Sequence, residues 1–164
     1  MGETGSVDGP GTADIEVVAA LLGRAPRGPF VVVVRGVDGR PVVIRNAPLL
    51  DDGTPMPTRH WLVDPGLRVA VSRLEATGAI DVVEAEIGVE VLAGVHERAA
   101  AERDVAMPFG WDGPRPTGGV AGTRVGVKCL HAHLADHLAG VDDPVGAWVA
   151  ARLDPAGPIA GRAD

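Results

Sequence analysis

Lys128 and Cys129 are the only lysine and the only cysteine of the 164-residue chain, and they are adjacent. The segment that they begin, KCLHAHLADH, also holds three of the five histidines. Thiols and imidazoles serve as nucleophiles, as general bases and as ligands of zinc or iron. We therefore expect the functional site in this segment, with Cys129 and His131 as the catalytic candidates.

A metal site is one interpretation of this segment. The hydrophobic spacing predicts a helix over residues 125–140, with an aliphatic stripe toward the core and Cys129 and His133 on the opposite face. Residues four apart lie one turn from each other, so these two side chains could share one ion. Zinc and iron suit a thiolate with an imidazole, and further ligands would come from elsewhere, for which His60 and Asp64 are candidates.

Cys129 has two other interpretations. It could be a nucleophile with His131 or His133 as its base, since a helix start and the neighbouring Lys128 favour a reactive thiol. It could also be a small buried hydrophobe if the helix is covered on both faces, because free cysteine is among the most buried residue types. The sequence leaves these alternatives open.

A second group of residues suits a small anion, because guanidinium groups bind phosphate or carboxylate in bidentate fashion. Our hypothesis is a pocket between the RNAPLLDDGTP loop (residues 45–55) and the VKCLHAH segment (residues 127–133). The expected ligand-binding residues are Arg45, Asn46, Asp52, Thr54, Arg59 and Lys128. The alternative is that these arginines only solvate one face of a sheet.

Composition narrows the function classes. The net charge is −7 and the pI is near 5.1, whereas a general nucleic-acid binder is usually basic. No stretch approaches the roughly 20 apolar residues of a membrane span, and the acidic start of the chain does not resemble a signal peptide. A single cysteine agrees with a reducing compartment. We expect a cytoplasmic protein without a membrane span.

The local signals predict an α+β fold. Two β-branched runs, VVVVRGV and PVVIRN, flank Asp38-Gly39 and predict a hairpin, and TRHWLV predicts a third strand. Thr12 or Asp14 is expected to cap the first helix, and Asp-Pro pairs at 64–65 and 143–144 to cap two others. Helices are expected over residues 15–22, 65–77, 81–104 with an interruption at Gly88, 125–140 and 144–153.

The predicted architecture is a small, mainly antiparallel three-stranded sheet with four to five helices packed on one side. We expect one domain over residues 12–153, in which a Gly/Pro-rich loop over residues 105–124 reaches across the helix of the KCLHAHLADH segment. Residues 1–11 are expected to be a disordered leader and residues 154–164 a flexible tail.

Several blocks resemble one known family. With PVVIRNAPLLDDGTPMPTRHWLV, SRLEATG, HERAAAERD, GGVAGTRVGVKCLHAH and DDPVGAWV, the chain resembles the actinobacterial domain of unknown function 501 over Ile15 to Leu153. The resemblance carries no established activity. It directs attention to Arg45, Asn46, Asp52, Gly53, Thr54, Pro57, Trp61, Arg73, Leu74, Glu75, Lys128, Cys129 and His131. The chain differs from relatives at His60 and His137, where they tend to have aromatic residues.

The resemblance also implies a housekeeping role, since the family tends to be encoded near cell-division genes. The alternative function is therefore a non-enzymatic protein-interaction module. It would use the acidic segment 74–104 and the loop aromatics Phe109 and Trp111 to bind a protein partner.

Overall fold

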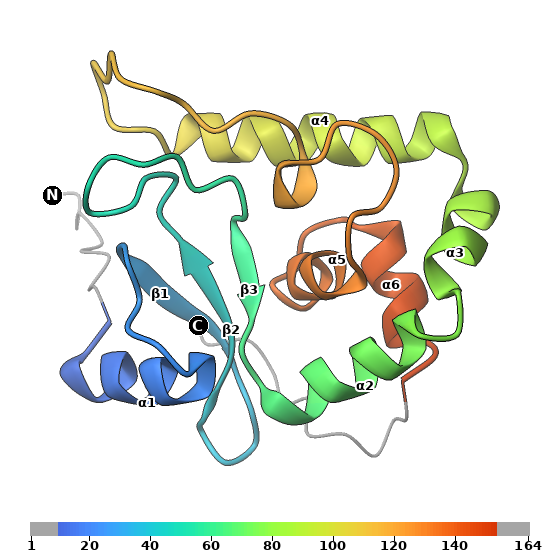
Figure 1. Ribbon diagram of the computed structural model, residues 1–164, viewed down its shortest axis with the longest axis horizontal. Helices are drawn as coiled ribbons and strands as arrows, with labels where there is room; N and C mark the ends of the chain where they lie inside the picture. Colours follow the sequence, from blue (N-terminus) through green and yellow to red (C-terminus); the bar gives the residue numbers. More distant parts are fainter. Residues whose placement is uncertain (1–9, 154–164) are drawn as a thin grey trace, which may run out of the picture.

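The computed structural model describes residues 10–153 and is built on a three-stranded antiparallel sheet with the order β1-β2-β3 (Figure 1). The strands are β1 (Phe30–Arg35), β2 (Pro41–Asn46) and β3 (His60–Leu62). Gly39 has a φ of 78° in the turn between β1 and β2, a conformation that glycine adopts at little cost. The predicted hairpin and third strand are confirmed.

The pairing of β1 with β2 is irregular. Its register shifts between Val32 and Val34 and again between Val34 and Arg35. Such shifts bend a strand and increase its local twist. The pairing of β2 with β3 is regular, with Ile44 opposite Trp61.

The described chain contains six α-helices, so the fold is α+β as predicted, but the expected number of four to five helices was too low. Gly88 has a φ of 85° and divides the predicted helix 81–104 into two. The helices are α1 (Thr12–Leu22), α2 (Pro65–Glu75), α3 (Ala79–Ile87), α4 (Val89–Val105), α5 (Leu130–Leu138) and α6 (Pro144–Ala150), and a short 3-10 turn, η1 (Val120–Gly122), lies before α5. None of these helices is long and apolar enough to cross a membrane.

Two Asp-Pro pairs begin helices as predicted. The side chain of Asp64 accepts a hydrogen bond of 2.7 Å from the backbone N–H of Leu67 at the start of α2. Asp143 accepts one of 2.9 Å from the backbone N–H of Gly146 at the start of α6. In both helices the proline occupies the first turn, where its missing N–H has no partner to lose.

The first helix begins differently from the prediction. Its N-cap is Gly11, without a side-chain hydrogen bond, so neither Thr12 nor Asp14 caps it. Asp14 instead forms a bidentate ion pair with Arg35 of β1, whose two terminal guanidinium nitrogens lie 3.1 and 2.8 Å from the two carboxylate oxygens. The pair ties α1 to the sheet. The predicted leader and tail fall largely on residues 1–9 and 154–164, which lie outside the described residues.

Helices cover both faces of the sheet, and the expectation of helices on one side was wrong (Figure 1). The helix α1 packs on one face, where Val18 meets Phe30, Ile44 and Val63. The larger core lies on the other face, between the sheet and the helices α2, α3, α5 and α6. The first face needs its own cover because Ile44 and Val63 would otherwise be exposed.

The helix α5 is surrounded by other elements. It contacts β3, α2, α6 and η1, and its buried residues lie on all sides: Leu130, Ala132, His133, Leu134, Ala135 and Asp136. The close approach of α6 depends on Gly146, since a Cβ there would lie 2.1 Å from the carbonyl oxygen of His133. The face opposite the predicted aliphatic stripe is therefore covered as well.

The Gly/Pro-rich loop is fastened to α4 by Arg103, whose side chain is 2% exposed. The guanidinium of Arg103 donates to four carbonyl oxygens, at distances between 2.7 and 3.5 Å: those of Pro57, Pro116, Gly118 and Gly119. Farther along, Val120 and Ala121 of η1 pack against Ala132 of α5. The loop thereby reaches α5 and the cavity beside it.

Candidate functional site

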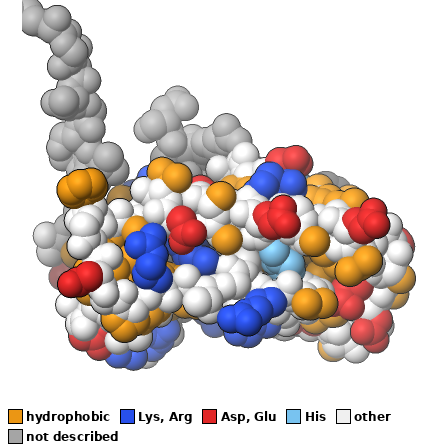
Figure 2. Space-filling view, turned by 90° about the horizontal axis from the view of Figure 1, so that it is seen from above, with side chains coloured by type: hydrophobic (Ala, Val, Ile, Leu, Met, Phe, Trp, Pro, Cys, Tyr) orange, Lys and Arg blue, Asp and Glu red, His pale blue; other side chains and the backbone are white. Residues whose placement is uncertain are grey.

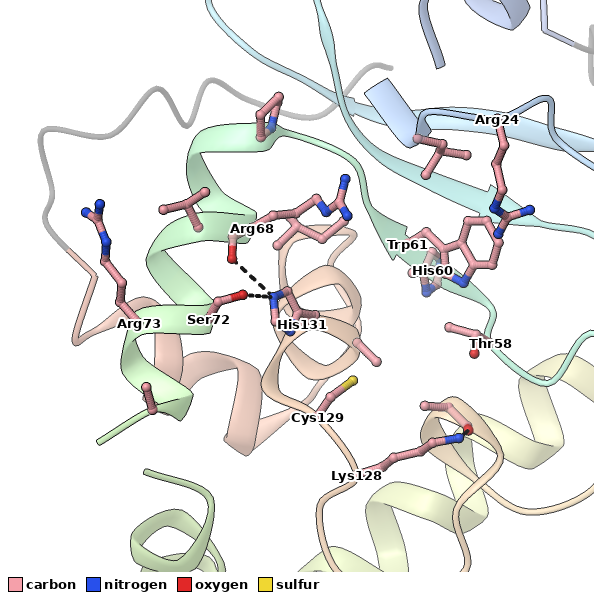
Figure 3. Close-up of a pocket in the computed structure, with 17 residues that line it drawn as sticks. Arg24, Thr58, His60, Trp61, Arg68, Ser72, Arg73, Lys128, Cys129 and His131 are labelled. Carbon is pink, nitrogen blue, oxygen red and sulfur yellow. Dashed lines mark hydrogen bonds between the residues drawn. The ribbon is translucent and has the colours of Figure 1, made fainter. Parts of the chain in front are cut away.

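A hollow of about 960 Å³ lies between α2, β3 and the start of α5 (Figure 3). Four of its lining residues are permanently cationic, namely Arg24, Arg68, Arg73 and Lys128, and none of its lining residues is Asp or Glu. Figure 3 shows Arg68 extending from α2 into the hollow, while Arg73 lies at the rim and points outward. We call this hollow the cationic cavity.

The geometry of α2 explains which of its residues face the cavity. Leu67 and Val71 are buried in the core, so the helix is fixed by this apolar face. Arg68 and Ser72 follow one position later, again four residues apart, and line the cavity together. The cap at Asp64 fixes where the helix begins and thus the direction in which these side chains point.

The segment before α5 is not helical, which corrects the predicted helix over residues 125–140. The helix begins at Leu130, and Cys129 is its N-cap, with φ −158° and ψ 147°. Carboxylates from other helices hold this segment: Glu84 accepts from the backbone N–H of Val127 at 2.6 Å, and Glu75 accepts from that of Leu130 at 2.7 Å. Cys129 is partly buried and lines the cavity.

His131 lies between two hydrogen-bond acceptors. Its Nδ1 is 3.2 Å from a carboxylate oxygen of Glu75, and its Nε2 is 3.2 Å from the carbonyl oxygen of Arg68 and 3.2 Å from Oγ of Ser72. A carboxylate and a carbonyl only accept, so an imidazolium that donates from both ring nitrogens satisfies both of them, whereas the hydroxyl of Ser72 can either accept from Nε2 or donate to it. The side chain of Cys129, the Arg68 carbonyl and Glu75 raise the pKa of His131, against the opposing effect of burial. The raised pKa favours the positively charged form of His131, whose charge is paired with that of Glu75.

His60 is held by a buried carboxylate. Its Nδ1 lies 2.7 Å from Oδ1 of Asp136, and both side chains are less than one-tenth exposed. Burial raises the pKa of Asp136, and the hydrogen bond from His60 opposes that effect. The pair joins β3 to α5 and fixes the orientation of the imidazole, which lines the cavity.

The structure brings together only some of the predicted site residues. Lys128, Cys129 and His131 line the cationic cavity, whereas the predicted ligands of the 45–55 loop do not. Asn46 is buried, donates from Nδ2 to the carbonyl oxygen of Thr58 at 3.1 Å, and borders a separate hollow of about 160 Å³.

Arg59, Asp52 and Thr54 make contacts within the fold. Arg59 donates to the backbone oxygen of Asn46 and, at 3.2 Å, to Glu102 of α4. Asp52 accepts from the backbone N–H of Thr54 at 2.9 Å, and the hydrogen bonds from Thr54 lower the pKa of Asp52. These contacts stabilise the loop and its attachment to α4. Arg45 lies on β2, opposite Val31 and His60, and lines none of the hollows described above.

The proposed metal pair is separated by the fold. His133 is completely buried and its Nδ1 lies 2.7 Å from Asp143, whereas Cys129 faces the cavity. The helical wheel placed both on the face opposite the aliphatic stripe because it continued α5 back to residue 125. Within residues 10–153 no group of three or more His, Cys, Asp or Glu side chains is arranged to hold a metal ion.

Sequence reasoning missed most of the cavity. Arg24, Arg68 and Ser72 line it, yet none was a candidate. The spacing of Arg68 and Ser72, four apart on the polar face of a predicted helix, was the available signal. Trp61 and Arg73, which also line the cavity, had been noted only through the family resemblance.

Comparison with known proteins identifies the family. The family model described as "Protein of unknown function (DUF501)" matches residues 32–151, and the chain belongs to this family. No curated protein and no solved structure matched the chain.

Proposed function

We propose that this DUF501 chain binds a small anion, such as a phosphate or a carboxylate, in the cationic cavity. The observation that carries the proposal is the local charge. A protein of net charge −7 lines one hollow with Arg24, Arg68, Lys128 and, at the rim, Arg73, and with no acidic side chain. A concave surface of one charge sign focuses the electric field and attracts ions of the opposite sign.

The arginines and the lysine of the cavity have no carboxylate partner among the described residues, whereas His131 pairs with Glu75 at 3.2 Å. Among residues 10–153 the arginines with carboxylate partners are Arg27, Arg35, Arg59 and Arg152, all outside the cavity. Arg68 instead donates to the carbonyl oxygen of Leu21 at 3.2 Å, and Lys128 to that of Ala121 at 3.3 Å. A carbonyl orients a cation without cancelling its charge, so the guanidinium of Arg68 can still bind an anion.

The two catalytic candidates have different parts in this proposal. His131 is proposed to act as an imidazolium, which has no lone pair with which to accept a proton from Cys129. Cys129 lies at the cavity wall as the single thiol of the chain, and a proton acceptor for it would come from the ligand or from solvent. The proposed location of the protein remains the cytoplasm.

Alkylation of Cys129 tests the charge of the cavity directly, since the wild-type chain has one site of reaction. Iodoacetate is anionic and iodoacetamide is neutral. The rate of alkylation of Cys129 by iodoacetate divided by the rate with iodoacetamide, normalised to the same ratio for glutathione, therefore reports the local electric field. We expect this normalised ratio to exceed one severalfold, and to fall in Lys128→Gln and in Arg68→Gln. Arg115→Gln, at an exposed position outside the cavity, is the matched control.

Ligand binding is measured on the same proteins. Isothermal titration calorimetry with inorganic phosphate should show saturable binding that weakens in Arg68→Gln and is unchanged in Arg115→Gln, and phosphate should slow the alkylation of Cys129. A normalised rate ratio of one in the wild-type protein, together with no phosphate binding, would overturn the proposal.

A second candidate function is the protein-interaction module. It is favoured by Val105 and Phe109, which are 88% and 107% exposed. The other loop aromatic, Trp111, is engaged: it donates to the carbonyl oxygen of Pro114 at 3.0 Å and packs beside Gly53. On the face above α4, Figure 2 shows acidic side chains interspersed with basic and hydrophobic ones rather than one acidic patch. Stoichiometric co-purification of one partner, lost in Phe109→Ser and retained in Arg68→Gln, would favour this function.

A further inference from the structure

The cationic cavity has a second wall with a different chemistry. Trp61 lies there on β3, beside the apolar side chains of Leu22, Leu62 and Val69. The indole packs partly against the core beneath α1 and is otherwise exposed, and it lines the same cavity as the cations of α2 and of the segment before α5 (Figure 3). The cavity therefore offers an aromatic wall and a cationic wall to one ligand.

Trp61 is the tryptophan that remains available for stacking. The ring of Trp148 is covered by the guanidinium of Arg152 at 3.5 Å from the ring centre, and its Nε1 donates to Glu86. Over Trp61 the guanidinium of Arg24 lies at 5.3 Å. Arg24 is exposed and has no ion pair among the residues described, so a planar ligand can lie beside it against the indole.

The backbone of β3 adds donors and acceptors to the same wall. The sheet order makes β3 an edge strand. The bonds from Val63 N–H to Val42 and from Asn46 N–H to Arg59 show that Trp61 directs its backbone groups toward β2. By the alternation of an antiparallel pair, the N–H and C=O groups of His60 and Leu62 point away from β2. Both residues line the cavity.

We propose that the anion bound here is the phosphate of a mononucleotide, whose base stacks on Trp61 while the phosphate lies among Arg68, Lys128 and His131. This inference rests on the proposed anion-binding function and narrows its ligand class. A flat aromatic base with donors and acceptors on its edge matches the indole and the free backbone groups of β3. The volume of about 960 Å³ is at the upper end for small-ligand sites and accommodates a mononucleotide.

The ligand is a mononucleotide rather than a nucleic-acid chain. Polymer binding depends on neutralising many phosphates along a basic surface. The protein is acidic overall, and the cations of this site lie within one hollow rather than along an extended basic surface. A single phosphate group with one base satisfies both walls.

Isothermal titration calorimetry of the full chain separates the contribution of the base from that of the phosphate. The probes are inorganic phosphate, ribose 5-phosphate, adenosine, and the 5′-monophosphates of adenosine, guanosine, cytidine and uridine. We expect at least one nucleotide to bind about tenfold or more tightly than ribose 5-phosphate, in line with the stacking of a base on an aromatic side chain. Adenosine without its phosphate should bind more weakly than its monophosphate.

Variants assign the effect to the indole. Trp61→Leu should lower nucleotide affinity to the level of ribose 5-phosphate and leave the affinity for ribose 5-phosphate unchanged. Trp61→Phe preserves a ring and should retain most of the preference; it also provides the test if the leucine variant fails to fold. Trp111→Leu, outside the cavity, is the matched control and should preserve the preference.

The outcomes distinguish the two proposals. Equal affinity for ribose 5-phosphate and all four nucleotides, or equal losses for both ligand types in Trp61→Leu, would refute the nucleotide while leaving the anion site in place. Binding of adenosine that the phosphate does not strengthen would also refute it. Absence of binding by every phosphate compound would overturn the anion site itself.

Discussion

Asp143 binds the backbone N–H of Gly146 and the ring of His133 at the junction of α5 and α6. Its replacement by alanine tests how much these two contacts contribute to the free energy of unfolding. One carboxylate oxygen accepts from the backbone N–H of Gly146 at 2.9 Å, and the other lies 2.7 Å from Nδ1 of His133. The side chains of Asp143 and His133 are both fully buried, and Nε2 of His133 has no hydrogen-bond partner among the described residues. Asp143→Ala removes a helix cap and the single polar contact of a buried imidazole.

The expected magnitude follows from these two losses. Removing an N-cap costs about 0.5–2 kcal/mol, and leaving a buried donor unsatisfied costs about 1–3 kcal/mol. We expect Asp143→Ala to lower the free energy of unfolding by about 2–5 kcal/mol. Asp64→Ala is the matched control, because Asp64 caps α2 in the same Asp-Pro context without a buried imidazole partner. Its expected cost is about 1 kcal/mol.

Urea unfolding followed by circular dichroism measures both variants. A double-mutant cycle of Asp143→Ala with His133→Leu isolates the contribution of the buried pair from that of the cap. Equal losses for Asp143→Ala and Asp64→Ala would refute the reasoning. A coupling below about 0.5 kcal/mol in the cycle would also refute it, since residues in direct contact usually couple more strongly.

Three further predictions concern packing, the loop and charge. Gly146→Ala forces a methyl group against the carbonyl oxygen of His133, and urea unfolding should show a loss of about 3 kcal/mol or more. Arg103→Met removes the donor to four carbonyl groups, so we expect a loss of about 2–4 kcal/mol and faster proteolysis within residues 106–119. The pKa of His131 is raised above its ordinary value of 6.5, so at pH 6.5 and below the side chain carries its positive charge and contributes the stability that depends on this charge. Both the charge and this stability are lost as the pH rises through the raised pKa. Calorimetry with sulfate between about pH 6 and 9 should therefore show weakening affinity, and His131→Gln should remove that dependence.

Each of these has a contradicting result. If Gly146→Ala has the same free energy of unfolding as the wild-type protein, α6 does not approach α5 as closely as described. If Arg103→Met is cleaved within residues 106–119 at the same rate as the wild-type protein, other contacts hold the loop. A pH dependence of sulfate affinity that persists in His131→Gln would assign the titration to another group. Arg115→Gln serves as the control for sulfate binding.

The parts of the fold that could be predicted are those with local signals. Asp38-Gly39 requires only its own backbone conformation to make a turn, and Asp64 and Asp143 cap helices through amides three residues away. Gly88 marked the break between α3 and α4, although the sequence did not show that two separate helices result. Such signals operate within a few residues and need no knowledge of the tertiary structure.

The start of α5 could not be predicted, because distant residues determine it. No Ser, Thr, Asp or Asn stands at its N-cap; the free amides of Val127 and Leu130 are held by Glu84 and Glu75 from other helices. Helical periodicity alone continued the helix through Cys129. This placed Cys129 and His133 on one face, although the fold separates them.

The candidate site was predicted only where rare residues mark it. Lys128, Cys129 and His131 stand out by type and do line the cavity. The sequence does not distinguish Arg59 from Arg68, yet Arg59 has a carboxylate partner and Arg68 has none among the described residues. That difference depends on which distant side chains the fold places beside each guanidinium, so a single sequence cannot reveal it.

The irregular pairing of β1 has a consequence for the behaviour of the protein in solution. A strand at the border of a sheet offers unsatisfied amides and carbonyls to any extended segment of another molecule. The register shifts on either side of Val34 interrupt that ladder and twist it, so a straight incoming strand can match it over only a few residues. The β1 edge of the sheet is therefore a poor site for pairing with an extended segment of a neighbouring copy.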